Sequence, residues 1–158
     1  PFDFDGIPRP LDSNATNGPA FDIGAYEFLL ATADSNGDGI PDSWCQRFGF
    51  NPVDASVATD DPDLDGCDNS GEYVADTNPT NALSYFHIES ISSRPATTVS
   101  FTSSTNRLYT LIYSTNLNGG VWTNVPGQQN IRATSAVTEL RDTNAAPEKF
   151  YRVGVRAP

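Results

Sequence analysis

The sequence predicts a mainly β protein in three parts: an N-terminal β segment, a small loop unit with two short helices, and a C-terminal β-sandwich. Two acidic, turn-rich runs in the middle of the chain predict the loop unit, and short alternating runs after residue 83 predict the sandwich. The abundance of Asn, Thr, Ser, Gly and Pro supports this class, because most of these residues are common in turns. The expected boundaries are 1–33, 34–82 and 83–158.

The N-terminal part, residues 1–33, contains short apolar pieces that turn-forming residues separate. Its best strand candidate is Phe21–Phe28, in which apolar and polar side chains alternate. Asp12–Gly18 is rich in Asp and Asn, and it is either an ordinary turn or the remnant of an ion-binding loop.

The most specific pattern in the sequence is the twelve-residue run Asp61–Glu72. Its oxygen donors follow the order of a calcium loop of the EF-hand type, with a glycine at position 6 for the sharp turn. The expected ligands are, in order, Asp61, Asp63, Asp65, the carbonyl of Cys67, Asn69 and Glu72. Carboxylates this close would repel one another without a cation, which favours the metal site over the alternative of a plain acidic surface loop.

A second run, Asp34–Cys45, has the same order of donors up to position 9. Its expected ligands are Asp34, Asn36, Asp38, the carbonyl of Ile40, and Asp42. Position 12 is a cysteine where glutamate is expected, so this loop needs an oxygen from elsewhere, for which the candidates are Asp76, Asn78 and Asp54. Alternatively, the run is a vestigial turn in which Asp42 only caps the following helix. The two runs together predict about two calcium ions.

Short helices are expected to leave the two loops, over Asp42–Phe48 and Asn69–Ala75. Gly49 fits the end of the first helix, because glycine readily adopts the left-handed conformation found there. We expect three aromatic residues of this unit to form a small shared core: Trp44, Phe48 and Tyr73. Helices this short suit a rigid spacer better than a calcium sensor, whose helix pair opens to expose a groove.

The two cysteines, Cys45 and Cys67, lie one in each loop. If the loops pack as a pair, we expect a disulfide between them, which would add about 3 kcal/mol of stability by chain entropy. Two buried free thiols are the alternative. Thiolate ligands are not expected, since the surrounding oxygen donors suit calcium and not zinc. A disulfide beside calcium sites predicts an extracellular or cell-surface location.

From residue 83 onward, runs rich in β-branched and aromatic residues alternate with turns. Six or seven short strands at this spacing predict a β-sandwich of the immunoglobulin type. The expected strands are Tyr85–Ile91, Thr97–Thr102, Leu108–Ser114, Val121–Val125, Ala136–Leu140 and Phe150–Val155. The expected core or half-core residues are Phe101, Tyr109, Trp122 and Phe150. Trp122 and Tyr113 are also candidates for an aromatic platform that binds sugar.

Composition and charge argue against several classes of function. The formal net charge is −11 and no basic patch is visible, so nucleic acid is not expected as a partner. No apolar run reaches membrane-spanning length. The chain starts at Pro1 without a signal peptide, which predicts a mature or excised portion of a longer precursor. The single histidine, His87, falls in an expected strand and no catalytic motif is present, so we expect no enzymatic activity.

Three stretches resemble known families of secreted bacterial proteins. The first stretch resembles the closing stretch of parallel β-helix proteins; it runs from Phe4-Asp5-Gly6 through Arg9-Pro10 to Asp22-Ile23-Gly24-Ala25-Tyr26-Glu27. The second, residues 34–82, resembles thrombospondin type 3-like calcium repeats. It departs from them where acidic residues are expected, at Cys45, Asn51 and Asn78. The C-terminal β-sandwich of Planctomycetes–Verrucomicrobia secreted proteins resembles residues 84–156, at Tyr109-Thr110-Leu111, Ser114-Thr115-Asn116-Leu117, Trp122 and Phe150-Tyr151-Arg152-Val153. These resemblances imply an extracellular architecture stiffened by calcium and no particular activity.

A terminal fragment of a β-helix cannot cover its own apolar edge, because stacked rungs need neighbours. We therefore expect residues 1–33 either to continue an upstream domain or to pair with another subunit, and an exposed strand edge invites addition to a neighbouring sheet. The expected function is that of an extracellular structural protein, rigidified by calcium, that assembles as a filament or surface-layer subunit. The alternative is a carbohydrate- or surface-binding module cut from a larger secreted enzyme, which makes glycans a second candidate partner.

Overall fold

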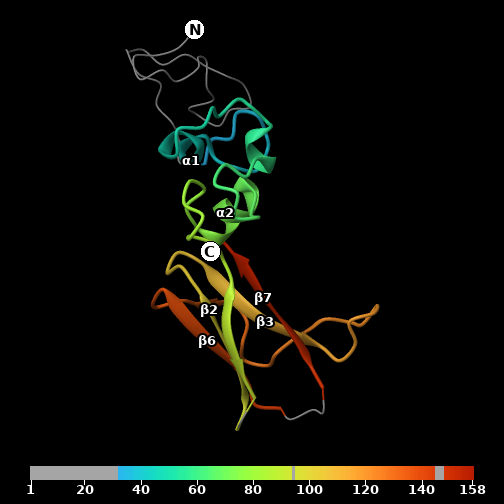
Figure 1. The fold of residues 1–158 in the computed structure, drawn as a ribbon. Coiled ribbons are helices and arrows are strands. Elements are labelled where there is room, and N and C mark those ends of the chain that lie inside the picture. The colour runs from blue at the N-terminus through green and yellow to red at the C-terminus, as the bar shows by residue number, and fades with distance from the viewer. Residues whose placement is uncertain (1–31, 94, 145–147) are drawn as a thin grey trace. The chain divides into compact units, whose positions relative to one another are not determined.

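The structure is a computed structural model that describes residues 32–93, 95–144 and 148–158. This described part is mainly β, with antiparallel sheets and two short α-helices, which confirms the predicted class (Figure 1). It divides into two compact units: unit 1 runs to Tyr73 and includes Pro79–Leu83, and unit 2 comprises Val74–Asn78 and Ser84–Pro158. The predicted segment 1–33, with its strand candidate Phe21–Phe28 and the Asp12–Gly18 run, lies outside the described residues except for residues 32 and 33.

Unit 1 contains helices directly after the two acidic loops, where the sequence predicts them. Helix α1 spans Asp42–Arg47, the 3₁₀ helix η1 spans Val57–Thr59, and helix α2 spans Asn69–Ala75. Gly49 follows α1 with a φ of 79°, which confirms the predicted C-cap. The N–H of Gly49 donates to the carbonyl of Gln46 at 3.1 Å, and that of Phe50 donates to the carbonyl of Cys45 at 2.8 Å. These two bonds form a Schellman motif, which satisfies the last carbonyls of the helix.

A small apolar core holds unit 1 together. Its buried members are Ile40, Cys45, Val57 and Ala58. The ring centre of Trp44 lies 4.8 Å from that of Phe48 and 6.1 Å from that of Tyr73, which confirms the predicted aromatic cluster. Because α1 supplies Trp44 and α2 supplies Tyr73, this cluster ties together the helices that follow the two loops.

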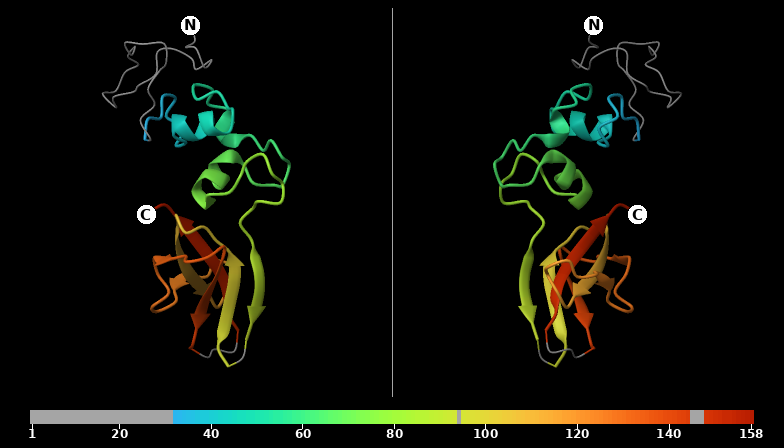
Figure 2. Two further views of the ribbon diagram at one scale, coloured as in Figure 1. Left: turned by 90° about the vertical axis from the view of Figure 1, so that its left-hand side faces the viewer. Right: turned by 90° about the vertical axis from the view of Figure 1, so that its right-hand side faces the viewer.

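Unit 2 consists of two antiparallel sheets (Figures 1 and 2). One sheet has the strand order β1-β2-β6, and in the other the strand β3 pairs with β4, β5 and β7. The strands of the first sheet are β1 (Ile88–Ser92), β2 (Thr97–Thr102) and β6 (Val137–Asp142). Those of the second are β3 (Leu108–Ser114), β4 (Thr123–Asn124), β5 (Ile131–Arg132) and β7 (Phe150–Arg156).

Both sheets contribute side chains to one core. Its fully buried members are Val99 and Phe101 from β2, Tyr109 and Leu111 from β3, Leu140 from β6, and the loop residues Val125 and Ala133. They occupy alternate positions along β2 and β3, as the two-residue period of a strand requires. The expectation of Phe101 and Tyr109 in the core is therefore confirmed.

The other two aromatic residues expected in the core or half-core differ in burial. Trp122 is half-buried, which agrees with a half-core position. Phe150 is 38% exposed, so its prediction was wrong. The reason is the register of β7, in which the inward positions belong to Tyr151, Val153 and Val155.

The strand boundaries agree best with the sequence where the pairing is longest. β2 and β3 begin and end at the predicted residues. β1 starts three residues later than predicted, at Ile88, and the two-residue strand β5 was not predicted. Across the described part of the chain, no helix has the length and apolar character needed to cross a bilayer.

Candidate metal centre

The two acidic loops of unit 1 have the same internal hydrogen bonds. In each loop the N–H at position 6 donates to the aspartate at position 1, at 2.9 Å from Gly39 and 3.0 Å from Gly66. In each loop the N–H at position 7 also donates to the aspartate at position 5, at 2.8 Å in both cases. In both loops the N–H at position 4 also donates to the side chain at position 1, and the N–H at position 5 donates to the side chain at position 3. The loops are therefore two copies of one local structure.

Backbone geometry explains why each loop needs its glycine and ends where its helix begins. Gly39 and Gly66, both at position 6, have φ values of 90° and 94°, a region that side chains with a Cβ rarely enter. The N–H of Asp42 donates to the carbonyl of Ala33 at 2.7 Å, and the N–H of Asn69 donates to the carbonyl of Asp60 at 2.9 Å. In both cases this bond joins position 9 to the residue before position 1, so it closes the loop at the first residue of the helix.

The loop Asp61–Glu72 brings three carboxylates together. One oxygen from each of Asp61, Asp63 and Asp65 lies within 4.8 Å of the others. Two ligands on opposite sides of a calcium ion are separated by roughly 4.6–5.2 Å, because each lies 2.3–2.6 Å from the ion. The spacing of the three oxygens therefore fits a shared calcium ion. Without a cation, each pair of charges at this distance would repel by on the order of 1 kcal/mol even in water.

Several oxygens of this loop are buried without a hydrogen-bond donor. They are Oδ2 of Asp63, Oδ2 of Asp65 and Oδ1 of Asn69, for none of which the described residues supply a partner. Asn69 is fully buried and uses its amide nitrogen to donate to the carbonyl of Val57 at 2.8 Å. Leaving a buried acceptor unsatisfied costs about 1–3 kcal/mol. A cation bound by these oxygens would remove that cost.

Glu72, at position 12, has a buried carboxylate and is only 1% exposed. Its backbone N–H donates to the carbonyl of Asp68 at 3.0 Å inside the first turn of α2, which fixes where its side chain starts. A carboxylate is seldom buried unless it is paired or binds a metal. The position of Glu72 in the loop and its burial both suit a calcium ligand with two oxygens.

The loop Asp34–Cys45 satisfies its own carboxylates. All six carboxylate oxygens of Asp34, Asp38 and Asp42 accept hydrogen bonds from other groups of the loop. Asp42 is fully buried and accepts from both the backbone N–H and the hydroxyl of Ser35. Burial raises the pKa of Asp42, while its bonds from Ser35 act in the opposite direction. The carboxylates of this loop are therefore satisfied within the loop, whereas Oδ2 of Asp63 and Oδ2 of Asp65 have no partner among the described residues.

The outside ligands proposed for the Asp34–Cys45 loop have other contacts. The carboxylate of Asp76 accepts hydrogen bonds from the Ser104 hydroxyl and, at 3.1 Å, from the Asn106 amide. The carboxylate of Asp54 accepts from the N–H of Ser56 at 3.0 Å. The residue at position 12 is Cys45. Burial and the nearby aspartates raise the pKa of its thiol to about 11. Its thiol is protonated at neutral pH and adds no charge to this site.

The predicted disulfide is not formed, and Cys45 and Cys67 are both free thiols. Cys45 lies in the apolar core of unit 1 with Ile40, Val57 and Ala58. Cys67 is half-buried among acidic groups, and its pKa is raised by burial first and then by carboxylates that include Asp65 and Glu72. The two thiols therefore occupy different surroundings, one apolar and one acidic. Sequence position alone does not reveal this difference.

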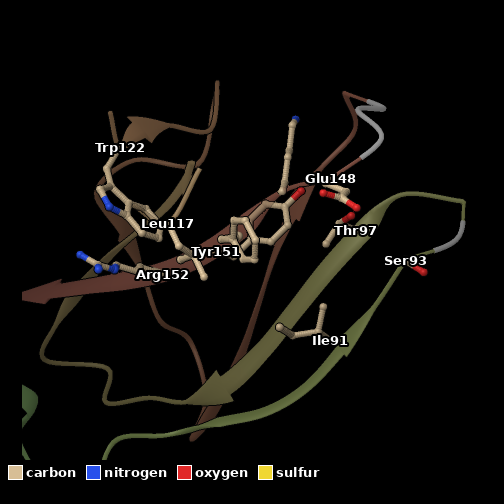
Figure 3. Close-up of a pocket in the computed structure, with 10 residues that line it drawn as sticks. Ile91, Ser93, Thr97, Leu117, Trp122, Glu148, Tyr151 and Arg152 are labelled. Atoms are coloured by element: carbon tan, nitrogen blue, oxygen red, sulfur yellow. The ribbon is translucent and has the colours of Figure 1, made fainter. Parts of the chain in front are cut away.

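A second candidate site is a groove of about 750 Å³ in unit 2 (Figure 3). It is lined by residues of β1, β2 and β7 and of the segment between β3 and β4, among them Ile91, Thr97, Leu117, Trp122 and Tyr151. The Arg152 guanidinium lies 3.9 Å from the ring centre of Trp122 and covers that ring. The other residue of the proposed sugar platform, Tyr113, is covered by Lys149, whose Nζ lies 4.3 Å from its ring centre.

Sequence reasoning missed a buried ion pair at the end of β6. Nζ of Lys149 lies 2.6 Å from Oδ2 of Asp142, and the Tyr151 hydroxyl donates to the same oxygen at 3.1 Å. Burial acts to raise the pKa of Asp142, but the bonds from Lys149, Asn144 and Tyr151 outweigh it and lower that pKa. The available signal was that Lys149 is the only lysine in the chain and lies seven residues from Asp142.

Comparisons of the chain with protein families, with curated proteins and with solved structures found no match.

Proposed function

We propose that the chain is an extracellular structural protein in which calcium rigidifies unit 1, and that it assembles as a filament or surface-layer subunit. The observation that carries the proposal is the cluster of Asp61, Asp63 and Asp65 oxygens within 4.8 Å of one another, in a loop that also buries Asn69 and Glu72. A half-buried acidic cluster of this kind gains stability from a bound cation. Millimolar calcium is typical outside the cell and suits extracellular modules.

The proposal includes a finer description of both units. Unit 2 is interpreted as an immunoglobulin-like sandwich, which its two antiparallel sheets and single shared core support. Unit 1 is interpreted as a thrombospondin type 3-like pair of calcium loops, which the repeated hydrogen bonds support. No catalysis is proposed: Nδ1 of His87 lies 3.1 Å from the carbonyl of Tyr85 and its ring packs on the Tyr85 ring, as in a structural role.

Isothermal titration calorimetry tests the calcium part of the proposal. We expect Asp65→Ala to weaken the tighter binding step by at least about tenfold, because it removes a charged ligand from the cluster. The matched control is Asp60→Ala, which removes the same charge from an exposed side chain next to the loop and should leave binding unchanged. Equal affinities of the two variants, or no calcium binding by the wild-type chain, would refute the metal site.

Electron microscopy of the purified chain tests the assembly part. With calcium we expect filaments or sheets, and with a chelator we expect them to disappear, because the loops lose the ion that orders them. Monodisperse monomers under both conditions would refute the assembly. Assemblies that are equally abundant with and without calcium would separate assembly from the calcium site.

A second candidate function is carbohydrate binding at the groove of unit 2. The observation in its favour is that Trp122, Phe150 and Tyr151 line one groove of about 750 Å³. The Arg152 guanidinium over the Trp122 ring argues against simple sugar stacking on that face. Binding to a glycan array that Trp122→Ala abolishes would support this candidate, and the absence of binding by the wild-type chain would exclude the glycans tested.

A further inference from the structure

The two sheets of unit 2 leave one side of their shared core open. β1 hydrogen-bonds only to β2 and β7 only to β3 among the described strands, so each sheet has a free edge. The groove of about 750 Å³ takes lining residues from both edge strands, with Ile91 on β1 and Tyr151 on β7 (Figure 3). Because the groove lies between these two edges, there is room in it for a further strand.

Burial shows that apolar side chains beside this opening are not fully covered. Ile91 is 55% exposed, and every residue of β1 is exposed. On β7 the inward residues Tyr151, Val153 and Val155 are only half-buried, whereas Tyr109 and Leu111 on the neighbouring strand β3 are completely buried. An added strand with apolar residues on one face would cover this surface.

The β7 edge is better suited than the β1 edge to receive a strand. β7 pairs with β3 over seven consecutive residues without a shift in register. β1 has an irregularity between Ile88 and Ser90, and bulges of this kind protect edges from pairing. A long regular edge such as β7 leaves a continuous row of unpaired backbone groups that extended segments can bind.

Charge indicates what kind of strand fits. Three of the nine basic residues of this acidic chain lie on or next to β7: Lys149, Arg152 and Arg156. Lys149 pairs with Asp142, but Arg152 and Arg156 form no salt bridge with a described carboxylate. Two arginines at an edge repel a second copy of β7, and they attract an acidic strand.

The sequence pattern of Phe21–Phe28, which lies outside the described residues, predicts such a strand. In Phe21–Phe28 the odd-numbered positions carry Phe21, Ile23 and Ala25 with Glu27 at the end, and the acidic residue Asp22 is on the even-numbered side. Antiparallel pairing that places Asp22 opposite Arg156 also places Gly24 opposite Gly154. In that register Ile23 and Ala25 share a face with the half-buried Val155 and Val153.

We propose that the free edge of β7 and the adjoining groove form an acceptor site for Phe21–Phe28 of a second copy of the chain. The inserted strand extends the β3–β7 sheet, covers the open side of the core and joins successive subunits. This inference rests on the proposed self-assembly and names the surfaces that carry it.

A charge-swap experiment on the full chain tests the site, with assembly followed by light scattering and electron microscopy. We expect Arg152→Glu/Arg156→Glu to raise the concentration needed for assembly by about tenfold or more, and Asp22→Lys, which lies opposite Arg156 in this register, to act in the same direction. A one-to-one mixture of the two variants should restore assembly, because each acceptor then meets a strand of opposite charge. The matched control, Arg132→Glu/Arg141→Glu, makes the same charge change on β5 and β6 and should assemble like the wild type.

Each remaining outcome has a defined meaning. Normal assembly of the Arg152→Glu/Arg156→Glu variant, with its far-ultraviolet spectrum unchanged, would overturn the acceptor site while self-assembly stands. Failure of the mixture to assemble, when both variants are folded, would overturn pairing between copies. Assembly that ignores both charge changes, together with glycan binding that depends on Trp122, would assign the groove to sugar. Failure of the wild-type chain to assemble with calcium would refute the proposed function and this inference with it.

Discussion

Leu64 has a backbone conformation that is unusual for a residue with a side chain. It occupies position 4 of the Asp61–Glu72 loop with a φ of 64°, and the equivalent residue of the other loop is Gly37 with a φ of 72°. Leucine is strained in this left-handed conformation, and here its side chain is 85% exposed. The conformation is kept because the Leu64 N–H donates to the Asp61 carboxylate at 2.9 Å.

We therefore expect Leu64→Asn to stabilise the protein by about 0.5–1 kcal/mol, because asparagine tolerates this conformation better and no core contact is lost. Denaturant unfolding in excess calcium measures the change. Leu83→Asn, which removes an equally exposed leucine (87%) without a positive φ, is the control and should be neutral. A destabilised Leu64→Asn variant would contradict the strain argument.

The Asp142–Lys149 pair makes the stability of unit 2 depend on pH. The pKa of Asp142 is lowered in the folded chain, so the stability that its charge contributes is present above the ordinary pKa of 3.8. That stability is lost as the pH falls through the folded pKa. Burial acts to lower the pKa of Lys149, but the hydrogen bond and charge of Asp142 outweigh it and raise that pKa. The stability that the Lys149 charge contributes is therefore present below pH 10.5 and is lost only at higher pH.

We expect Lys149→Met to destabilise the chain by about 2–4 kcal/mol at pH 7, because it leaves the Asp142 carboxylate, 1% exposed, without its cation. Arg141→Met removes a charge from a pair whose side chains are 64% and 52% exposed, and it should cost no more than about 1 kcal/mol. Urea unfolding between pH 3 and pH 8 compares them. Similar losses in both variants would show that burial does not strengthen the Asp142 pair.

At the scale of elements, the two loops share one backbone structure and differ in their side chains. The side chains at positions 1, 3 and 5 carry oxygen atoms in both loops, and these oxygens accept hydrogen bonds from equivalent backbone N–H groups. The loops differ at position 12, where Glu72 is a buried carboxylate and Cys45 is a neutral thiol in the apolar core. Calcium affinity depends on the number of charged ligands, so the Asp61–Glu72 loop should be the tighter site.

The position-matched variants Asp38→Ala and Asp65→Ala test this ranking. We expect Asp38→Ala to weaken only the weaker calcium-binding step and Asp65→Ala to weaken the tighter one by at least about tenfold. Calorimetry of both variants separates the two steps. If Asp38→Ala removed the tighter step, the buried carboxylate at position 12 would not be the feature that sets affinity.

At the scale of the whole molecule, calcium should stabilise unit 1 by mass action. A ligand at about 100 times its dissociation constant adds about 2.7 kcal/mol to the stability of the form that binds it. The chain has two tryptophans, Trp44 in unit 1 and Trp122 in unit 2. In Trp122→Phe, the fluorescence of Trp44 therefore reports on the core beside the loops.

We expect calcium to raise the thermal midpoint of the Trp44 signal by several degrees, and magnesium at the same concentration to raise it less, because magnesium keeps more of its own water. Fluorescence-detected melting with each ion and with a chelator measures the shifts. Identical midpoints with calcium and with chelator would contradict a calcium-stiffened unit 1.

The sequence by itself determined the local structure: both loops, both helices, the Gly49 cap, and the full extent of β2 and β3. These features depend on spacing over a few residues, through glycine conformations, aspartate turns and strand alternation. Only the tertiary structure decided the pairing of distant groups. It left Cys45 and Cys67 as separate thiols, turned Phe150 outward, joined Asp142 to Lys149, and opened a groove beside β7. The reason is that such contacts depend on which face of each element meets the core, and no local pattern records that orientation.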